Sequence, residues 1–557
     1  MDTQDLDILM GHLGDFGKYQ CFQFILHVLS GVTAGMHMLS LVTVGAVPDH
    51  RCYIPDIDQH SNITMYNHPE ADNYVPISKT GSYDNCNIFI NGTSSNETTR
   101  CNRWIYDDTY YKSSRGIEWD FVCDRRWMGA VAQSSYMFGV FLGAITLGSA
   151  ADKYGRKPVY CWSATLQLIL GVLVAFIPEY YSFLVIRFLY GIVGSAGAYI
   201  PGFVLTMELV GASKRTACGI AFQGAFAFGF MLVAGWGALV KDRQLLQVIY
   251  GLHSLILIAN WWIMDESPRW LWAQGRVKES VRIIQKALKM NGSNIKVDEA
   301  DYSSNVKLHN MEEKASSEEA GMMDLFKTPN LRNKTLNICL CWFANSIAYY
   351  GLSLSTGKMS GNPFLILFLM GLVEIPSYIL TSLIMDRTGR RGLIAFYMLT
   401  GGICCLGAAK MTQGSTESTT VVMIGKFLIA SSFAIVYNYS AELFPTVVRN
   451  SALGLGSMCA RLSGAMTPLI TLLDSFDPTL PAMIFGVIAL ISGFLTLFLP
   501  ETLGSPMPQS IEDGENFGVG DTCFTSCMGK KRRNANRRPT KEENMEQMVP
   551  LGTNNSK

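Results

Sequence analysis

The chain contains an internal duplication. Three features return in the same order at offsets of 234 or 235 residues: a charged turn with a central glycine, a glutamate seven residues before an arginine, and an acidic break. The repeated pairs are Asp152–Lys157 with Asp386–Arg391, Glu208 and Arg215 with Glu442 and Arg449, and Asp265–Pro268 with Pro500–Thr502. Each copy lies where a long apolar run ends. Because order and spacing agree, the sequence predicts two halves of similar architecture.

Long apolar runs account for most of the chain and are typical of membrane-spanning helices. About 20 apolar residues cross a bilayer as a helix, and twelve such runs can be read from the sequence. They lie near 20–47, 128–150, 158–177, 182–209, 216–240 and 245–264, and again near 335–356, 362–384, 392–410, 420–441, 451–473 and 482–500. Charged residues make up only 16% of the chain, against about 25% in soluble proteins. The sequence therefore predicts an all-α membrane protein with twelve transmembrane helices in two pseudo-symmetric six-helix bundles. Two repeated halves that rock about a central site are a design of secondary transporters.

Basic residues predict the orientation of the spans. If the chain begins in the cytoplasm, nine Lys and Arg residues fall in short cytoplasmic loops and four in short outer loops, which is the expected bias. Both termini are therefore expected to be cytoplasmic, in a multi-pass plasma-membrane protein. The expected parts are a cytoplasmic N-terminus (1–19), a first bundle (20–264) with an extracellular loop (48–127), a cytoplasmic middle loop (265–334), a second bundle (335–500) and a cytoplasmic tail (501–557), disordered from residue 505.

The extracellular loop contains cysteines and glycosylation signals. Its four cysteines are Cys52, Cys86, Cys101 and Cys123. In an oxidising compartment four cysteines indicate two disulfides, with three possible pairings that the sequence leaves open. Free thiols are the alternative. Three Asn-x-Ser/Thr signals lie in the same loop, and we expect glycosylation at Asn62, Asn91 and Asn96.

Several local strings resemble one family of transporters. They are Glu118–Trp127 (EWDFVCDRRW), Glu266–Leu271 (ESPRWL), Val373–Pro376 (VEIP), Ala441–Asn450 (AELFPTVVRN) and Leu499–Gly504 (LPETLG). With the repeated turns and the long loop after the first span, they resemble the major facilitator superfamily and, within it, the organic cation, carnitine and organic anion transporter family. The resemblance covers residues 10 to about 510. It is closest to the carnitine-type members around Gly35–His37 and Gly456–Met458.

Ionisable residues within spans are costly in hydrocarbon and indicate a cavity or a partner. We expect Glu374 and Arg461 to bind substrate, because a carboxylate can hold an ammonium group and a guanidinium can hold a carboxylate. By resemblance, Arg461 departs from the cation-selective relatives, which carry aspartate there, whereas carnitine-type and anion-type members carry arginine. One anionic and one cationic anchor would suit a zwitterion such as carnitine. The alternative is that Arg461 pairs with Glu374 or with a helix end.

Aromatic side chains on neighbouring spans complete the candidate site. Trp342 and Tyr349 are seven residues apart and lie on one helix face, and ring faces attract quaternary ammonium groups. The candidate substrate-binding residues are Glu374, Arg461, Trp342, Tyr349, Lys426, Phe222, Gln223 and Tyr437. Resemblance implies that Glu374, Trp342 and Tyr349 line the cavity. Replacement of Glu374 by glutamine is expected to abolish uptake without affecting surface expression.

The duplicated turns and the two glutamate–arginine pairs are candidates for a cytoplasmic gate. Arg156 can pair with an acidic side chain or with carbonyls at a helix end. We expect Glu208 to pair with Arg215, and Glu442 with Arg449. The candidate gating residues are Asp152, Gly155, Arg156, Lys157, Asp386, Gly389, Arg390, Glu208, Arg215, Glu442 and Arg449.

Composition and motifs argue against other classes of function. A net charge of zero disfavours nucleic acid as a partner. The sequence has neither a phosphate-binding Walker string nor a GxSxG nucleophile string, so we expect neither an enzyme nor a cofactor or metal, although coupling to a sodium or proton gradient fits the design. The expected partners are a small organic ion and the lipid bilayer, and the expected function is alternating-access transport of a carnitine-like zwitterion or an organic cation. The alternatives are an organic anion transporter and a membrane receptor.

Overall fold

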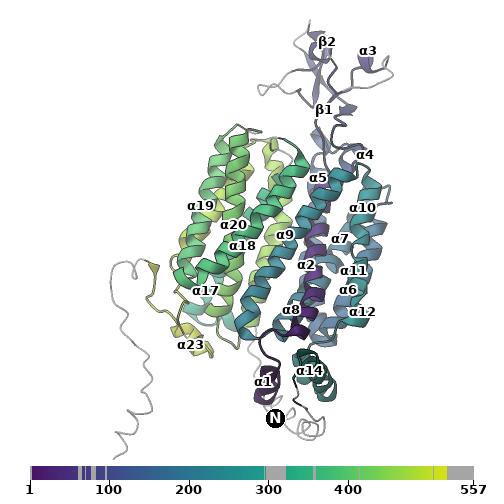
Figure 1. Cartoon of the computed structure of the whole chain (residues 1–557). Coiled ribbons are helices and arrows are strands. Elements are labelled where there is room, and N and C mark those ends of the chain that lie inside the picture. Colours follow the sequence, from purple (N-terminus) through teal and green to yellow (C-terminus); the bar gives the residue numbers. More distant parts are fainter. Residues whose placement is uncertain are drawn as a thin grey trace, which may run out of the picture.

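The computed structural model describes residues 3–59, 66–68, 70–76, 83–93, 97–293, 295, 322–355, 359, 361–412, 414–505 and 507–523. Figure 1 shows long helices side by side, with the N-terminus, α1 and α23 at one end of the bundle and the strands at the other. We call the end with the N-terminus the terminal face and the end with the strands the distal face.

Within the described residues, twelve helical segments run between the two faces. Those of the first half are α2 (Lys18–Val44), α5 (Trp127–Tyr154), α6 (Arg156–Leu173), the consecutive α7 (Tyr180–Gly191), η3 (Ile192–Tyr199) and α8 (Ile200–Leu209), α9 (Arg215–Leu239), and the consecutive α10 (Arg243–Leu252), α11 (Leu255–Ile258) and α12 (Asn260–Ile263). Those of the second half are α17 (Pro329–Leu354), α18 (Pro363–Thr388), α19 (Arg391–Lys410), α20 (Thr416–Leu443), α21 (Arg449–Thr471) and α22 (Leu480–Thr496). Each half therefore contributes six spans in the same order, as the duplication predicts.

The polarity of the spans indicates which of them line a cavity. Of the described helical segments, eight are long and apolar enough by themselves to cross a membrane, and α6, α17, α21 and α22 are not among them. α17 and α21 carry polar side chains near their middle, including Asn345 and Ser346 in α17 and Ser457 and Arg461 in α21. Polar groups inside a span are tolerated where they face a cavity or a partner helix. α17 and α21 are therefore the expected walls of a central site.

The two halves meet along two seams. α9 of the first half packs against α18 of the second, and α5 packs against α21. Figure 1 shows the first half, in purple to teal, beside the second half, in green to yellow. The arrangement leaves the middle of the bundle bordered by helices from both halves.

A small domain on the distal face separates α2 from α5. Strand β1 (His50–Cys52) pairs antiparallel with β4 (Trp104–Tyr106), and β2 (Asn87–Thr93) pairs antiparallel with β3 (Thr98–Arg100). Short helices complete it: α3 (Pro55–Asp58), η1 (Ala71–Asn73), α4 (Arg115–Glu118) and η2 (Cys123–Arg125).

Two disulfides and a buried ion pair hold this distal domain together. Cys52 is joined to Cys101 and Cys86 to Cys123, which selects one of the three pairings that the sequence left open. Arg51 and Asp58 form a fully buried ion pair at 2.8 Å. Of the predicted glycosylation sites, Asn91 lies in β2, whereas Asn62 and Asn96 fall outside the described residues.

Short helices cover the terminal face. They are α1 (Thr3–His12), η4 (Ala212–Lys214), α13 (Pro268–Ala273), α14 (Val277–Asn291), η5 (Met322–Phe326) and α23 (Ile511–Asn516). α1 and α14 share an apolar cluster that includes Leu6, Leu9, Val281, Ile284 and Leu288.

The expectation of a disordered tail from residue 505 is wrong for the part that the structure describes. The carboxylate of Glu515 accepts the backbone N–H groups of Asn330 and Leu331, both at 2.8 Å. The first N–H groups of a helix lack intrahelical acceptors and the helix dipole attracts an anion there, so Glu515 caps α17. Residues 524–557 of the tail lie outside the described residues.

Candidate functional site

A cavity of about 90 Å³ lies at the middle of the bundle, between the two halves. The first half contributes residues of α2, α5, η3 and α9, and the second half contributes residues of α17, α20 and α21. The lining residues are Ala34, Met38, Met137, Val140, Ser195, Tyr199, Gln223, Phe226, Trp342, Ser346, Tyr349, Tyr350, Phe433, Tyr437, Ser457, Ala460, Arg461 and Gly464. One molecule bound in this cavity could therefore contact four helical segments of the first half and three of the second.

Aromatic rings form much of the cavity wall. The rings of Trp342 and Tyr437 meet edge to face with centroids 4.3 Å apart, and those of Tyr349 and Phe433 are stacked at 6.0 Å. Trp342 and Tyr349 share one face of α17, as their spacing predicts. Ring faces carry partial negative charge and attract cations. The wall is therefore suited to an alkylated ammonium group.

Arg461 is the charged residue that lines this cavity. Its guanidinium donates to the backbone oxygen of Ser457 at 3.0 Å and to the hydroxyl of the same residue, one turn earlier on α21. Among the described residues, no carboxylate forms an ion pair with Arg461. A guanidinium has five N–H donors, so donors remain for a ligand. The cavity thus contains one cationic anchor.

Glu374 lies behind the cavity wall, in a buried ion pair. Its carboxylate is 2.9 Å from the ammonium group of Lys426, and both side chains are fully buried. The hydroxyls of Tyr349 and Tyr378 also donate to it, each at 2.8 Å. The ammonium group of Lys426 lies 3.1 Å from the centre of the Tyr349 ring and donates to Ser353 at 2.6 Å. Tyr349 therefore contacts both the cavity and the ion pair.

The structure brings most of the predicted substrate residues to the cavity, but not all of them. Gln223, Trp342, Tyr349, Tyr437 and Arg461 line it, whereas Glu374, Lys426 and Phe222 do not. Phe222 is fully buried and packs edge to face against Phe24 and Phe203. The expected pairing of Glu374 with Arg461 across one ligand is thus replaced by pairing of Glu374 with Lys426. As substrate contacts, all eight remain predictions.

Several cavity residues were missed by the sequence reasoning. They include Phe433, Ser457, Tyr350, Phe226 and Tyr199. Helix spacing offered a signal for three of them. Phe433 and Ser457 each lie four residues before a predicted residue, and Phe226 lies three residues after Gln223, so each shares a face with a predicted residue. Tyr350 and Tyr199 needed the packing between helices to be known.

The charged turns form the same contacts in both halves. Arg156 pairs with Asp152 at 3.0 Å and with Glu208 at 3.1 Å. In the second half Arg390 pairs with Asp386 at 3.0 Å and with Glu442 at 3.1 Å. Each set joins helix ends within one half, on the terminal face. The duplicated sequence therefore corresponds to a duplicated ion-pair network.

The expected pairing of Glu208 with Arg215, and of Glu442 with Arg449, is wrong. The guanidinium of Arg215 donates instead to the backbone oxygen of Val210 at 3.3 Å. That oxygen lies just past the last turn of α8, where carbonyl groups lack helical partners. Glu208 and Glu442 instead pair with the arginine of the turn in their own half, Arg156 and Arg390 respectively.

The glycine of each turn lies against a glutamate of the acidic break that follows the same half. Gly155 has φ +109°, and a Cβ there would lie 2.5 Å from the carboxylate of Glu266. The same carboxylate accepts the backbone N–H of Lys157 at 3.1 Å. Burial raises the pKa of Glu266, while backbone hydrogen bonds oppose that shift. Gly389 (φ +90°) and Glu501 repeat the arrangement, at 2.7 Å. Only glycine fits this position without strain.

Removing either turn ion pair should have a small and equal effect. Because the pairs are partly exposed, Glu208→Gln and Glu442→Gln should each lower the free energy of unfolding by about 1 kcal/mol. Combining Glu208→Gln with Arg156→Gln should cost no more than Arg156→Gln alone, since the arginine change already removes the contact with Glu208. Thermal stability of the purified protein measures this. Arg215→Gln is the matched control, and coupling of Arg215→Gln to Glu208→Gln would contradict the assigned pairs.

The fold and the central cavity define a membrane transporter built from two six-helix halves, and comparison with known proteins agrees. A family profile described as "Sugar (and other) transporter" matches residues 79–511. Among solved structures, the proton:xylose symporter XylE bound to 6-bromo-6-deoxy-D-glucose superposes with a TM-score of 0.57 at 16% identity, covering 90% of this chain and all of the other. The inward-open form from E. coli gives 0.58 at 16%, over 89% and 99%. At this identity the likeness supports the fold alone.

Relatives in sequence narrow the class further. The chain is 40% identical to the "Organic cation transporter protein" of Drosophila melanogaster, over 92% of this chain and 95% of the relative. It is 31% identical to "Solute carrier family 22 member 16" of Homo sapiens, over 92% and 93%. The "Solute carrier family 22 member 6-B" of Xenopus laevis is 31% identical over 91% and 94%. The chain therefore belongs to the organic cation, carnitine and organic anion transporter family of the major facilitator superfamily, and the predicted all-α, two-bundle fold is confirmed. This is a family of multi-pass membrane transporters of small organic ions and not of enzymes.

Proposed function

We propose that the protein carries small organic ions with a carboxylate group, preferably a carnitine-like zwitterion, across the plasma membrane by alternating access. The observation that carries the proposal is Arg461. Its side chain lines an aromatic cavity and has no ion pair with a described carboxylate, while Glu374 is already paired with Lys426.

The balance of charge around the cavity favours a carboxylate. Glu374 and Lys426 compensate each other at 2.9 Å, so Arg461 leaves the site with one positive charge. A substrate carboxylate would compensate that charge and could accept two parallel N–H bonds. A plain cation about 6 Å from the guanidinium would instead be repelled by about 3 kcal/mol at an effective dielectric constant of 20.

The aromatic wall supports a positive group at the other end of the substrate. Trp342, Tyr349, Phe433 and Tyr437 surround the cavity beside α21. Each ring face that is open to the cavity adds about 0.5–2 kcal/mol of attraction for an ammonium group, and one face of Tyr349 is already occupied by the ammonium group of Lys426. A trimethylammonium group in this wall and a carboxylate on Arg461 would use both features at once. The relatives named as organic cation transporters are consistent with the ammonium group.

The distal domain supports the orientation. Its two disulfides belong in an oxidising compartment, and the basic turns around Lys157 and Arg391 belong in the cytoplasm. We therefore assign the distal face to the outside and the terminal face, with both termini, to the cytoplasm.

Uptake by expressing cells tests the proposal. Radiolabelled carnitine should enter faster than tetraethylammonium, and the same assay with and without sodium identifies coupling to a sodium gradient. Cells that express an Arg461→Asp variant are the matched control. Faster uptake of tetraethylammonium than of carnitine by the unmodified protein would contradict the proposal.

An organic anion carrier is the second candidate, because the uncompensated Arg461 favours any carboxylate. A radiolabelled aromatic carboxylate in the same assay separates the two. Uptake of this compound with no uptake of carnitine would assign the aromatic wall to an aromatic substrate rather than to an ammonium group.

A further inference from the structure

A second, larger cavity of about 1400 Å³ lies on the distal side of the central one. On three helices its lining residues are nearer the distal face than the residues that line the central cavity. These are Leu41 against Ala34 and Met38 on α2, Leu352 against Ser346 and Tyr349 on α17, and Pro468 against Arg461 and Gly464 on α21. Cys86 and Arg100 of the distal domain also border it. This distal chamber therefore lies between the central cavity and the outside.

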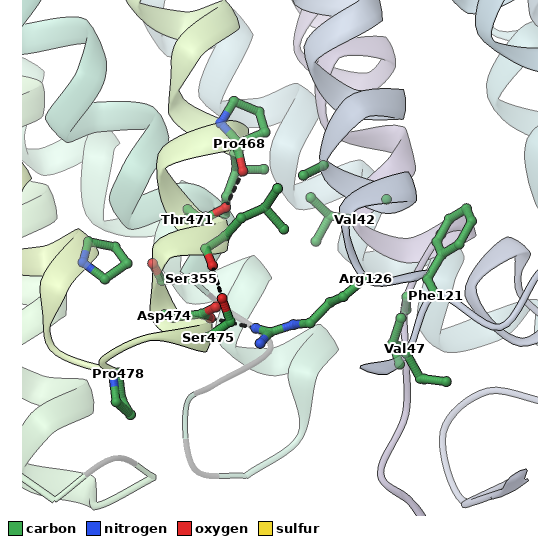
Figure 2. A pocket seen from close by; sticks show the side chains of 18 of the residues that line it. Val42, Val47, Phe121, Arg126, Ser355, Pro468, Thr471, Asp474, Ser475 and Pro478 are labelled. Carbon is green, nitrogen blue, oxygen red and sulfur yellow. Dashed lines mark hydrogen bonds and ion pairs between the residues drawn. The ribbon is translucent and has the colours of Figure 1, made fainter. Parts of the chain in front are cut away.

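An ion pair crosses the distal chamber from one half to the other. Arg126, just before α5, lies 2.5 Å from Asp474 of η7 (Leu472–Ser475), which continues α21. Figure 2 shows the arginine reaching across toward Asp474 and Ser475. The Asp474 side chain is 4% exposed and that of Arg126 is 44% exposed. The ion pairs of Arg156, Arg390 and Glu374 each join residues of the same half. The pair of Arg126 with Asp474 differs from them because it joins the two halves.

Arg126 is connected to the distal domain, and Asp474 is connected to the helix that carries Arg461. Arg126 follows Cys123, whose disulfide to Cys86 fixes it to the distal domain. Asp474 lies thirteen residues beyond Arg461 on the same helical rod, about 20 Å along its axis at 1.5 Å per residue. Pro468 lies inside α21 between them, where the missing backbone N–H weakens the helix and allows a bend. Figure 2 shows Pro468 and Thr471 on this rod above Asp474.

We propose that Arg126 and Asp474 form the latch that closes the outer mouth of the transporter. An N–O distance of 2.5 Å cannot persist if the outer ends of α5 and α21 separate by several ångströms. The latch is therefore made when the outer mouth is closed and broken when it opens. Because Asp474 and Arg461 share one rod, movement of α21 in the central cavity also moves the latch.

A cysteine in the central cavity reports how often the mouth is open. Ala34→Cys places a thiol on the cavity wall, and a membrane-impermeant methanethiosulfonate reagent is added outside cells. The rate of modification is normalised to surface protein and corrected for the chain that lacks the added cysteine. Asp474→Asn and Arg126→Gln should each raise the rate by about five- to tenfold, as loss of one partly buried ion pair would.

The controls separate the latch from general loosening. The double variant should react no faster than either single variant, because both changes break one contact. Arg125→Gln is the matched control: Arg125 is the neighbouring residue and pairs at 4.0 Å with Asp120 of its own half, so its rate should stay at the parent value. If a single variant fails to reach the surface, the exchanged pair Arg126→Asp with Asp474→Arg should reach it and react near the parent rate. Rates within twofold of the parent for both single variants, or effects that multiply in the double variant, would overturn the latch.

A second arm rests on the proposed function. Saturating carnitine should lower the modification rate of the parent protein, since a carboxylate on Arg461 would hold α21 in its closed position, and should lower it less in Asp474→Asn. Loss of this effect alone would contradict carnitine as the substrate and leave the latch standing, because the first arm uses no substrate.

Discussion

Replacement of Glu374 by glutamine is expected to reduce the amount of protein at the cell surface as well as its uptake. The change leaves the ammonium group of Lys426 fully buried without the carboxylate that now lies 2.9 Å away. Removing one member of a buried ion pair typically costs about 3–5 kcal/mol, roughly a fifth or more of the stability of an ordinary domain. Surface biotinylation and the thermal stability of the purified protein measure this. The sequence alone predicts that Glu374→Gln leaves surface expression unchanged. The ion pair of Glu374 with Lys426 is the reason that we expect surface expression to fall.

A double variant and a matched control make the result specific. Adding Lys426→Met to Glu374→Gln removes both charges and should recover most of the lost stability, since apolar replacement of a whole buried pair is often neutral. Glu417→Gln makes the same chemical change at the exposed start of α20, the helix that carries Lys426, and should have little effect. A Glu374→Gln variant as stable as the parent would show that the pair is not important for folding.

Replacement of Arg461 by glutamine is expected to reduce carnitine uptake strongly while leaving the protein at the surface. Hydrogen bonds to a charged group contribute about 1.5–3 kcal/mol, so loss of the carboxylate anchor should lower kcat/KM for a zwitterion by about 10- to 150-fold. The fold should tolerate the change, because Arg461 contacts Ser457 of its own helix and lines the cavity. Concentration-dependent uptake, normalised to surface protein, measures the effect.

Further variants at position 461 test the chemistry of the anchor. Arg461→Lys keeps the charge but loses the paired N–H donors, and should fall between the parent and Arg461→Gln. Arg461→Asp should shift preference from carnitine toward tetraethylammonium. An equal loss for both substrates in Arg461→Asp would count against a zwitterion site.

The fold could be predicted from sequence because its determinants are local and repeated. Apolar runs near 20 residues require helices in a bilayer, and the duplicated turns at Asp152 and Asp386 require two similar halves. The site could be predicted in part. Tyr349 and Trp342 reach the cavity because residues seven apart share a helix face. Glu374 could not be placed in the same way, since a carboxylate within a span is costly whether it faces a ligand or a neighbouring lysine.

The amino-acid sequence by itself determined the number and order of the spans, the repeated turns, and the residue types available for binding an organic ion. These follow from hydropathy, spacing and side-chain chemistry, which need no knowledge of which helices touch. The tertiary structure decided the partners: Glu374 with Lys426, Glu208 with Arg156, Cys52 with Cys101, and Arg126 with Asp474 across the two halves. Those pairings depend on how helices distant in sequence rotate and pack against one another, and only the assembled bundle fixes that.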